Sequence, residues 1–360
     1  MKKMITLILA LAMCLTCLSG CGAQKEKPAD QNDSNISATS SNPITLTFGH
    51  GQAESHSFHK AALHFKELIE DRSGGTIKVD VQGNGALGDE KEMAESLQLG
   101  AIDMCVVAVA TLTGFDSELD IFNMPYLFDN LNQVYKVLDG EIGQSAFAGL
   151  ENQGLKVLGF FDLGFRNMTN NLRPIKAPSD CTGLRMRTLQ SAVCVEGLNM
   201  FGIDAVSMSF GELFTALQTG AIDGQENPIS VIDASQFYSV QKYLSLTEHI
   251  YPVLPVMIST STFNNLTSEQ QALVLECVAD TVTFQREADR RSPNVANSVS
   301  ITIWISSART ESTLLTFLGR IILIMSSPTI EPLRTHSAPL IKAHQTIVYC
   351  ESSSLQGNEA

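Results

Sequence analysis

The sequence predicts an α/β protein of two similar lobes, each built on a mostly parallel sheet flanked by helices. Strand-like and helix-like segments alternate along the chain, which is typical of doubly wound sheets. Residues 95–104 (ESLQLGAIDM) and 215–224 (TALQTGAIDG) share Leu, Gln, Gly, Ala, Ile and Asp in register, and in both copies a helical pattern stops at glycine and enters a short apolar run. With 360 residues, 44% of them hydrophobic, the chain is long enough for two domains with substantial cores.

Residues 1–20 have the composition of a secretory signal. Lys2 and Lys3 precede an apolar run that is too short for a membrane span and is soon followed by polar sequence. Small residues precede Cys21, as in a bacterial lipoprotein signal, so we expect Cys21 to be the lipidated first residue of the mature chain. The alternative is an ordinary cleaved signal with a chance cysteine. Residues 21–43 are expected to form a flexible tether that holds the folded body outside the membrane.

The charge and the cysteines limit the classes of partner. A formal net charge of −14 argues against nucleic acid or an anionic membrane surface, since phosphate binding needs clustered Lys and Arg. A small anionic ligand stays compatible with this charge, because one or two local arginines decide its binding. The cysteines beyond the lipidation site are odd in number and widely spaced, so we expect buried free thiols. They are Cys105, Cys181, Cys194, Cys277 and Cys350.

The first lobe is expected over residues 44–162. Its predicted elements are, in order, a strand at 44–49, a helix at 58–71, a strand at 76–82, the first copy of the repeated helix, a buried strand at 104–110, a helix at 129–150 and a buried strand at 155–161. Residues 253–292 return to this lobe as a strand at 253–260 and a helix that opens with Thr267 and Gln270. Residues 293–360 have few charges and no sustained period, which indicates an atypical tail, either degenerate or out of frame.

The second lobe is expected over residues 163–252. Its predicted elements are a strand at 183–188, an amphipathic helix that Ser209 and Glu212 start as a capping box and Gly220 ends, a buried turn at 221–228 into a polar Gln-Glu-Asn-Pro tip, and a long helix at 228–244. Arg187 and Asn227 thus lie at the ends of buried elements, where side chains can point into a cleft.

The sequence has few motifs that would indicate an enzyme or a metal site. We find no nucleophile elbow, phosphate-binding glycine loop, paired zinc cysteines or catalytic carboxylate pair, so we expect no enzyme and no cofactor. His50, His56, His59 and His64 are the concentration of metal-ligand types. Zinc needs closer and better fixed ligands, and solvated histidines are the simpler interpretation. A surface lipoprotein that binds a metal ion through His50–His64 is the alternative function.

Arg166 and Arg187 are better candidates for ligand binding. A guanidinium matches a carboxylate with two parallel donors, and each charge-assisted bond contributes about 1.5–3 kcal/mol. The alternative for each arginine is a structural ion pair with one of the many acids. Asn227 would add a donor and an acceptor to the same ligand, or it is a turn residue ahead of Pro228. Phe210 is core filler by default, although a ring at a helix start can also floor a pocket.

Several segments, in this order and spacing, resemble the DctP family of extracytoplasmic solute receptors of TRAP (tripartite ATP-independent periplasmic) transporters. They are FGHGQAESHSFHKAALHFKELIEDRSGG, NGALGDEKE, PYLF, GFRNMTNN, GLRMRT, MSFGELFTALQTGAIDGQENP and FYSVQKYLSLTEH. The resemblance covers about residues 44–291. It implies a periplasmic-binding-protein-like (Venus flytrap) fold that closes on a small organic acid, such as a C4-dicarboxylate or a sugar acid, and passes it to membrane permease subunits driven by an ion gradient.

The same resemblance assigns roles to individual residues. It implies a carboxylate clamp at Arg187, a second cation at Arg166, a hydrogen-bond partner at Asn227, a pocket wall at Phe210 and a first-lobe contact at Glu90. Family members often have Val-Pro after the clamp arginine, where this chain has Thr188 and Leu189, so the acid stays unnamed. The tail also lacks the helices that normally complete the fold.

Overall fold

The protein is described by a computed structural model over residues 43–290 and 300–303. Its strands are β1 (Ile44–His50), β2 (Ile77–Gln82), β3 (Met104–Val106), β4 (Leu155–Phe161), β5 (Arg166–Asn170), β6 (Arg185–Thr188), β7 (Asp204–Ser207), β8 (Gly224–Pro228), β9 (Tyr243–Ile250), β10 (Leu254–Ser259) and β11 (Ser300–Ile303). Its α-helices are α2 (Ser57–Arg72), α3 (Glu90–Gln98), α4 (Leu131–Leu138), α5 (Glu141–Phe147), α6 (Ala192–Asn199), α7 (Phe210–Thr219), α8 (Ile229–Ala234), α9 (Thr260–Asn265) and α10 (Ser268–Arg290). Its 3-10 helices are η1 (Val109–Thr111), η2 (Ser117–Asn123), η3 (Ala148–Gln153), η4 (Pro178–Cys181) and η5 (Phe237–Ser239).

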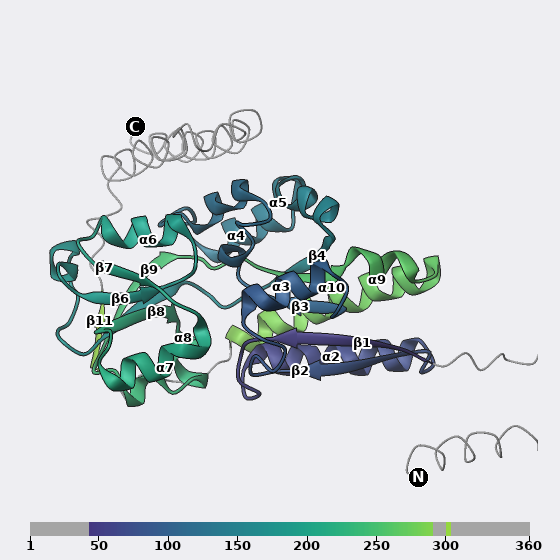
Figure 1. Cartoon of the computed structure of the whole chain (residues 1–360), viewed down its shortest axis with the longest axis horizontal. Coiled ribbons are helices and arrows are strands. Elements are labelled where there is room, and N and C mark those ends of the chain that lie inside the picture. The colour runs from purple at the N-terminus through teal and green to yellow at the C-terminus, as the bar shows by residue number, and fades with distance from the viewer. Residues whose placement is uncertain (1–42, 291–299, 304–360) are drawn as a thin grey trace, which may run out of the picture. The chain divides into compact units, whose positions relative to one another are not determined.

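The strands form two mixed sheets, flanked by helices (Figure 1). The sheet of the first lobe has five strands in the order β2-β1-β3-β10-β4, and β10 runs antiparallel to both of its neighbours while the other pairings are parallel. The sheet of the second lobe has six strands in the order β11-β9-β5-β8-β6-β7, and here β5 is the reversed strand. The predicted two-lobed α/β class is confirmed, with one reversed strand in each described sheet.

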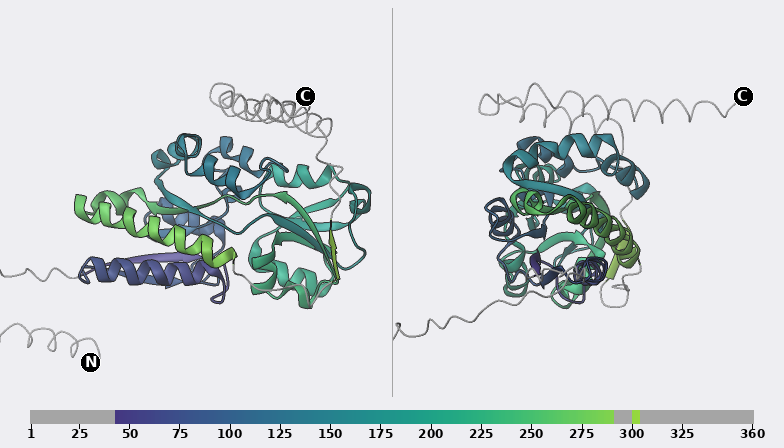
Figure 2. Two further views of the ribbon diagram at one scale, coloured as in Figure 1. Left: turned by 180° about the vertical axis from the view of Figure 1, so that it is seen from behind. Right: turned by 90° about the vertical axis from the view of Figure 1, so that its right-hand side faces the viewer.

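Helix α2 of the first lobe forms because its apolar residues recur on one face. Phe58, Ala61, Ala62, Phe65 and Ile69 of α2 are all buried, and Phe65 packs edge to face on Phe48 of β1. The long helix α10 lies alongside α2 (Figures 1 and 2). Burying such side chains contributes about 1.5–3 kcal/mol each, so this contact ties the late segment of the chain to the first lobe.

The repeated segment adopts the same local structure in both copies. The helix α3 is followed by Gly100 at φ +69°, and α7 is followed by Gly220 at φ +71°, a conformation that glycine adopts without strain. The aspartate after each turn then accepts a hydrogen bond from the backbone amide of a neighbouring strand. Asp103 accepts from Thr47 in β1 at 2.9 Å, and Asp223 accepts from Arg185 in β6 at 2.8 Å. The motif therefore joins the exit of a helix to the adjacent parallel strand.

Among the described residues two segments connect the sheets, 162–165 and 251–253, and one carboxylate bonds to both of them. Asp162 follows β4 and its Oδ1 accepts from the Gly164 amide at 2.8 Å and from the Tyr251 hydroxyl, which lies after β9, at 3.0 Å. The other carboxylate oxygen accepts from the hydroxyl of Tyr135 in α4. The side chain of Gln285 in α10 bonds both backbone polar groups of Asp162. Both connections therefore share one buried polar centre.

Several sequence predictions of local structure are wrong. The predicted helix at 129–150 is divided into α4, α5 and η3, with Gly140 at the break. The predicted helix at 228–244 stops with α8, because Gln236 takes a left-handed conformation at φ 54°, after which come the 3-10 helix η5 and strand β9. The predicted polar tip is β8, all five residues of which are buried in the sheet. The predicted strand at 104–110 is also shorter, since it ends at Val106.

The start of α7 also differs from the prediction. The Ser209 hydroxyl donates to the Glu212 carboxylate at 3.0 Å, and no side-chain bond caps the helix backbone, so the pair is present but is not a capping box. A full capping box occurs instead at α3, between Asp89 and Glu92.

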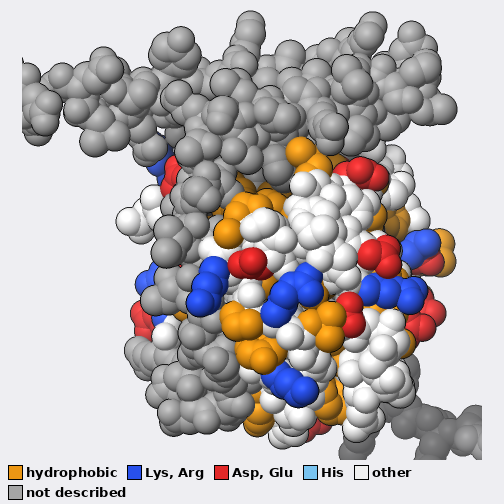
Figure 3. Space-filling model, turned by 90° about the vertical axis from the view of Figure 1, so that its left-hand side faces the viewer, with side chains coloured by type: hydrophobic (Ala, Val, Ile, Leu, Met, Phe, Trp, Pro, Cys, Tyr) orange, Lys and Arg blue, Asp and Glu red, His pale blue; other side chains and the backbone are white. Residues whose placement is uncertain are grey.

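The described surface and cysteines agree with a folded body that carries mixed charges. Figure 3 shows one face on which basic and acidic side chains are interspersed. The four cysteines within residues 43–290 are free and buried, as predicted, whereas Cys350 lies outside the described residues. None of the helices in the described part combines the length and the apolar character that a membrane crossing requires. The predicted signal, tether and tail lie outside the described residues, apart from Pro43 and β11.

Candidate functional site

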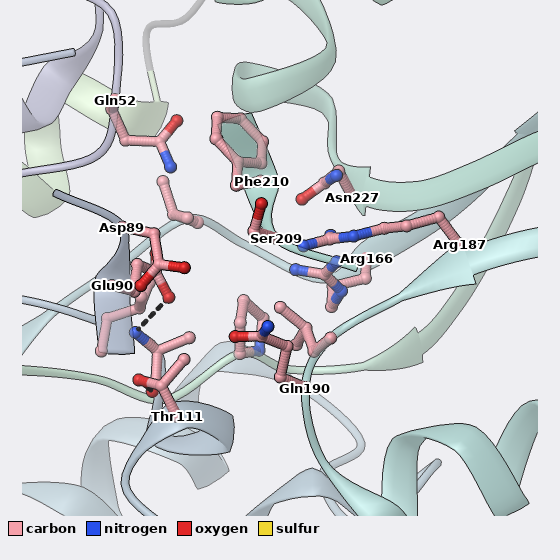
Figure 4. A pocket seen from close by; sticks show the side chains of 15 residues that line it. Gln52, Asp89, Glu90, Thr111, Arg166, Arg187, Gln190, Ser209, Phe210 and Asn227 are labelled. Carbon is pink, nitrogen blue, oxygen red and sulfur yellow. Dashed lines mark hydrogen bonds between the residues drawn. The ribbon is translucent and has the colours of Figure 1, made fainter. Parts of the chain in front are cut away.

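A pocket is lined by residues of both lobes, and the atom-free space along this lining, open solvent included, is about 530 Å³. The second lobe supplies Arg166, Arg187 and Asn227 from β5, β6 and β8 and Ser209 and Phe210 from the start of α7. The first lobe supplies Gln52, Asp89, Glu90, Ala108 and Thr111. In Figure 4 the arginines and the asparagine lie opposite the glutamine and the two acids. All five pocket residues named from the sequence, Arg187, Arg166, Asn227, Phe210 and Glu90, thus line one space.

Arg187 is a buried cation with spare hydrogen-bonding capacity. It is 2% exposed, its Nε donates to the carbonyl oxygen of Met208 at 2.9 Å, and its buried Nη1 has no hydrogen-bond partner. Burial lowers its pKa to about 10, the nearby Arg166 charge acts in the same direction, and Glu226 and Glu90 oppose the shift. The side chain therefore stays charged at neutral pH. Within the described residues it makes no ion pair.

Arg166 is equally buried but is already paired. Its guanidinium forms a forked ion pair with Glu226 and also donates to the Glu226 carbonyl oxygen. Thr188 donates to the same carboxylate at 2.8 Å, and the Nε2 atom of His249 lies 3.4 Å from it. Burial alone would raise the pKa of Glu226, but the charge and hydrogen bonds of Arg166 and the nearby His249 ring lower it to about 2. Arg166 thus fits the structural ion-pair alternative, whereas Arg187 does not.

Asn227 and Phe210 complete the second-lobe side. The amide of Asn227 donates to Gln225 of the same strand, which leaves its own oxygen free of any hydrogen bond to a described residue. Phe210 opens α7 and packs edge to face on Phe237, with ring centroids 6.0 Å apart. This ring therefore belongs both to the core contact and to the pocket wall.

The first-lobe side carries carboxylates. Asp89 caps α3, since its Oδ1 accepts from the amides of Lys91 and Glu92 at 2.9 Å. The neighbouring Glu90 is partly buried, and its Oε2 accepts from the Ala108 amide at 3.0 Å, the dashed line in Figure 4. Burial raises the pKa of Glu90, while the Ala108 amide and the positive charges of Arg187 and Arg166 oppose this rise. Cations and acids therefore face each other across the pocket.

The DctP family, bacterial extracellular solute-binding protein family 7, matches residues 48–296. The chain belongs to this family. The family resemblance stated from the sequence is thereby confirmed, and the protein is a solute receptor of the TRAP type, not an enzyme. Its family indicates a location outside the cytoplasm.

Similar proteins include receptors for different organic acids. The 2,3-diketo-L-gulonate-binding periplasmic protein YiaO of Escherichia coli is 34% identical over 243 residues, which are 68% of this chain and 74% of that protein. The C4-dicarboxylate-binding protein DctB of Bacillus subtilis is 33% identical over 238 residues, 66% of this chain and 68% of that protein. The crystal structure of the sugar acid binding protein DctPAm from Advenella mimigardefordensis in complex with galactonate has a TM-score of 0.75 and 33% identity, and covers 81% of this chain and 96% of that one.

The histidines of this DctP-family receptor have roles other than joint metal binding. His50 and His59 contact each other through ring nitrogens 3.1 Å apart, and His64 stacks on Phe284. His56 caps α2 by accepting from the Phe58 amide. Burial lowers the pKa of His50 to about 4 and that of His56 to about 3. Within the described ranges no three His, Cys, Asp or Glu side chains come together as a metal site, so the structure gives the metal-binding alternative no support.

Sequence reasoning missed Glu226 and Gln52 of the receptor. Glu226 lies in the segment that the sequence predicts as a polar tip, where an acid is expected to be exposed and to have no role. Its neighbours offer the signal that could have found it: an acid inside a motif bounded by apolar runs needs a buried cation, and Arg166 was available. Gln52 follows β1 in a polar loop and carries no comparable signal.

Proposed function

We propose that this protein is a lipid-anchored TRAP receptor that captures a small organic acid through Arg187 and delivers it to the permease subunits in the membrane. The observation that carries this proposal is the buried Arg187 guanidinium, whose Nη1 has no partner and which lines the pocket. The relatives named for a diketo sugar acid and for C4-dicarboxylates, and the structure with bound galactonate, support an acid as the ligand.

A carboxylate suits Arg187 on energetic grounds. A buried charge without a partner is unfavourable by several kcal/mol, and a bound anion relieves this cost while forming charge-assisted hydrogen bonds of about 1.5–3 kcal/mol each. Two such bonds, with neutral bonds elsewhere, suffice for micromolar capture, which needs about 8 kcal/mol. The free protein therefore holds its cation ready for the ligand.

The other pocket residues take supporting roles in this proposal. Arg166 orients the ligand from beside the clamp but adds less binding energy, since Glu226 already neutralises it. The free oxygen of Asn227 accepts from a ligand hydroxyl, Phe210 covers the apolar part of the ligand, and Glu90 contacts it from the first lobe. Residues 44–162 with 253–292 form one lobe of the receptor in this proposal, and residues 163–252 form the other.

Calorimetry with purified receptor tests the clamp. A panel of mono- and dicarboxylates and sugar acids is titrated into the wild type, Arg187→Ala and Arg185→Ala. Arg185 is the matched control because it lies on the same strand but is exposed, with Asp204 as its partner. We expect at least one acid to bind the wild type and Arg185→Ala with similar affinity, and Arg187→Ala to weaken binding at least 100-fold. Wild-type binding that survives Arg187→Ala would refute the clamp.

The anchor and the partner need separate experiments. Labelling of cells with a radioactive fatty acid should mark the wild type but not Cys21→Ser. An unlabelled wild type contradicts the anchor and supports the ordinary signal. Uptake of the identified acid by cells that express the receptor with its permease subunits tests delivery, which requires uptake to depend on the receptor.

A further inference from the structure

The two sides of the pocket leave opposite hydrogen-bonding needs unmet. On the second-lobe side the buried free group is a donor, the Nη1 of Arg187, and the Asn227 side-chain oxygen is a free acceptor. On the first-lobe side the Glu90 carboxylate offers a free acceptor. Glu90 uses Oε2 for the Ala108 amide, and its Oε1 has no hydrogen bond to any described residue. Gln52, which is 5% exposed, has a buried Oε1 without a partner, but Figure 4 shows its amide nitrogen, a donor, turned toward the pocket. A ligand that satisfies both sides needs an anionic acceptor at one end and donors at the other.

An ionised dicarboxylate cannot meet both needs. Its first carboxylate pairs with Arg187, but its second carboxylate is an acceptor that comes close to the Glu90 and Asp89 carboxylates. Acceptor then faces acceptor and negative charge faces negative charge, both of which are unfavourable in a partly buried site. A hydroxyl at the same place donates to Glu90 and brings no charge.

We propose that the pocket selects an organic acid with one carboxylate and one or more hydroxyl groups at the far end over a dicarboxylate of the same length. This inference rests on the proposed function, since Arg187 must hold the single carboxylate. Glu90 is then a residue that determines specificity, because one of its carboxylate oxygens is committed to the Ala108 amide and the other has no partner among the described residues.

Binding of a dicarboxylate would be favoured instead if Glu90 were protonated. A protonated Glu90 could donate to a second carboxylate, and burial does favour the proton. The Ala108 amide and the two arginines favour the ionised form instead. The charged groups around Glu90 are Asp89 on its own helix and Arg166 and Arg187 on the facing sheet. Discrimination against dicarboxylates should therefore increase as pH rises from 5 to 8.

Matched ligands test the proposal. Succinate and 4-hydroxybutanoate differ only in whether the far carbon is a carboxylate or a CH₂OH group, and galactarate and galactonate repeat the comparison in a longer acid. Calorimetry at pH 8 gives the affinity ratio within each pair for the wild type, Glu90→Gln and Glu95→Gln. Glu95 is the matched control because it lies on the same helix but is exposed.

We expect the hydroxy acid to bind the wild type at least 10-fold more tightly than the dicarboxylate in each pair that binds. Glu90→Gln should bring the ratio within about 3-fold of one, since its amide can donate to a carboxylate, and Glu95→Gln should leave it unchanged. A wild type that binds the dicarboxylate as tightly overturns the inference, and so does a ratio unchanged in Glu90→Gln or shifted equally in Glu95→Gln. The wild-type ratio decides alone if Glu90→Gln does not fold. A wild type that binds no acid overturns the proposed function itself.

Discussion

The helices α3 and α7 carry the two copies of the repeated segment, and they end alike but begin differently. Each is followed by a left-handed glycine and an aspartate that bonds a neighbouring strand. At the start, where both helices reach the pocket, α3 presents Asp89 and Glu90, whereas α7 presents Ser209 and Phe210. The shared end serves the fold, and the divergent start lines the pocket. A repeat in this protein therefore marks scaffold, and departures from the repeat mark the site.

The largest expected change in stability comes from the carboxylate of Glu226, in the sheet of the second lobe. Glu226→Gln removes the partner of buried Arg166, so we expect unfolding free energy to fall by about 3–5 kcal/mol at pH 7. The pKa of Glu226 is lowered in the folded protein, so its stabilisation is present above the unfolded value near 4.5 and is lost as pH falls through about 2. The difference in unfolding free energy between the wild type and Glu226→Gln should therefore become smaller as the pH falls from about 4.5 to about 2. Urea denaturation from pH 2 to 7 measures it.

The control for this measurement is Glu248→Gln in the same sheet, because Glu248 is exposed. We expect it to change stability by less than about 0.5 kcal/mol. Equal losses of unfolding free energy in Glu226→Gln and Glu248→Gln would contradict the prediction.

The shared helix ends are tested by the two aspartates. Asp103→Ala loses bonds to both the Thr47 amide and the Thr262 hydroxyl, and should cost about 2–3 kcal/mol. Asp223→Ala loses the bond to the Arg185 amide and should cost about 1–2 kcal/mol. Asn at either position keeps an acceptor and should cost less. Urea midpoints rank the four variants, and an Asp→Ala variant as stable as wild type contradicts the proposed equivalence of the two ends.

The two glycines separate backbone strain from crowding. Gly220→Ala adds a Cβ with no heavy atom within 4 Å, so only the left-handed conformation is unfavourable, by about 1–2 kcal/mol. Gly100→Ala carries the same strain and places its Cβ 2.9 Å from Ser261 Oγ, so it should destabilise more. Gly114→Ala, with free space and no positive φ, is the control. A reversed order in thermal denaturation would show that the sites are not comparable.

The smallest effect on stability is expected at Glu90, at the start of helix α3. Glu90→Gln should stabilise the ligand-free protein at pH 7, by less than about 1 kcal/mol, because glutamine retains an acceptor for the Ala108 amide. The folded pKa of Glu90 is raised, so its ionisation destabilises the protein as pH rises above the unfolded value near 4.5. The advantage of the variant should therefore appear above that pH and vanish below it. Thermal melts at pH 4 and 7 test the sign, and a destabilised variant at pH 7 contradicts it.

Much of the fold was predictable, because apolar periodicity reports burial directly. The helix α10, the strands β4 and β10 and the glycines of the repeat follow from local patterns. Strand β8 does not, since its polar residues are buried by partners distant in sequence: Glu226 pairs with Arg166 and Gln225 bonds Thr169. A local pattern contains no information on such pairing.

The candidate site was predictable mainly as a set of motifs. The residues Arg166 and Arg187 looked equivalent in the sequence, and geometry separates them, because only Arg166 has a carboxylate within reach. Glu90 was named through the family resemblance, but its relation to Ala108 and to the facing arginines depends on how the two sheets meet at the pocket. Charge balance across a pocket is a property of tertiary structure.

The four buried thiols of the described residues form no disulfide, so this part of the chain does not depend on oxidation to fold. Burial raises the pKa of Cys181 and Cys194 to about 12 and that of Cys105 still further, so at neutral pH these sulfurs are almost entirely protonated and chemically inert. The body can mature in an oxidising compartment without help from disulfide-forming catalysts. Alkylation of these sulfurs would then occur only in molecules that have opened.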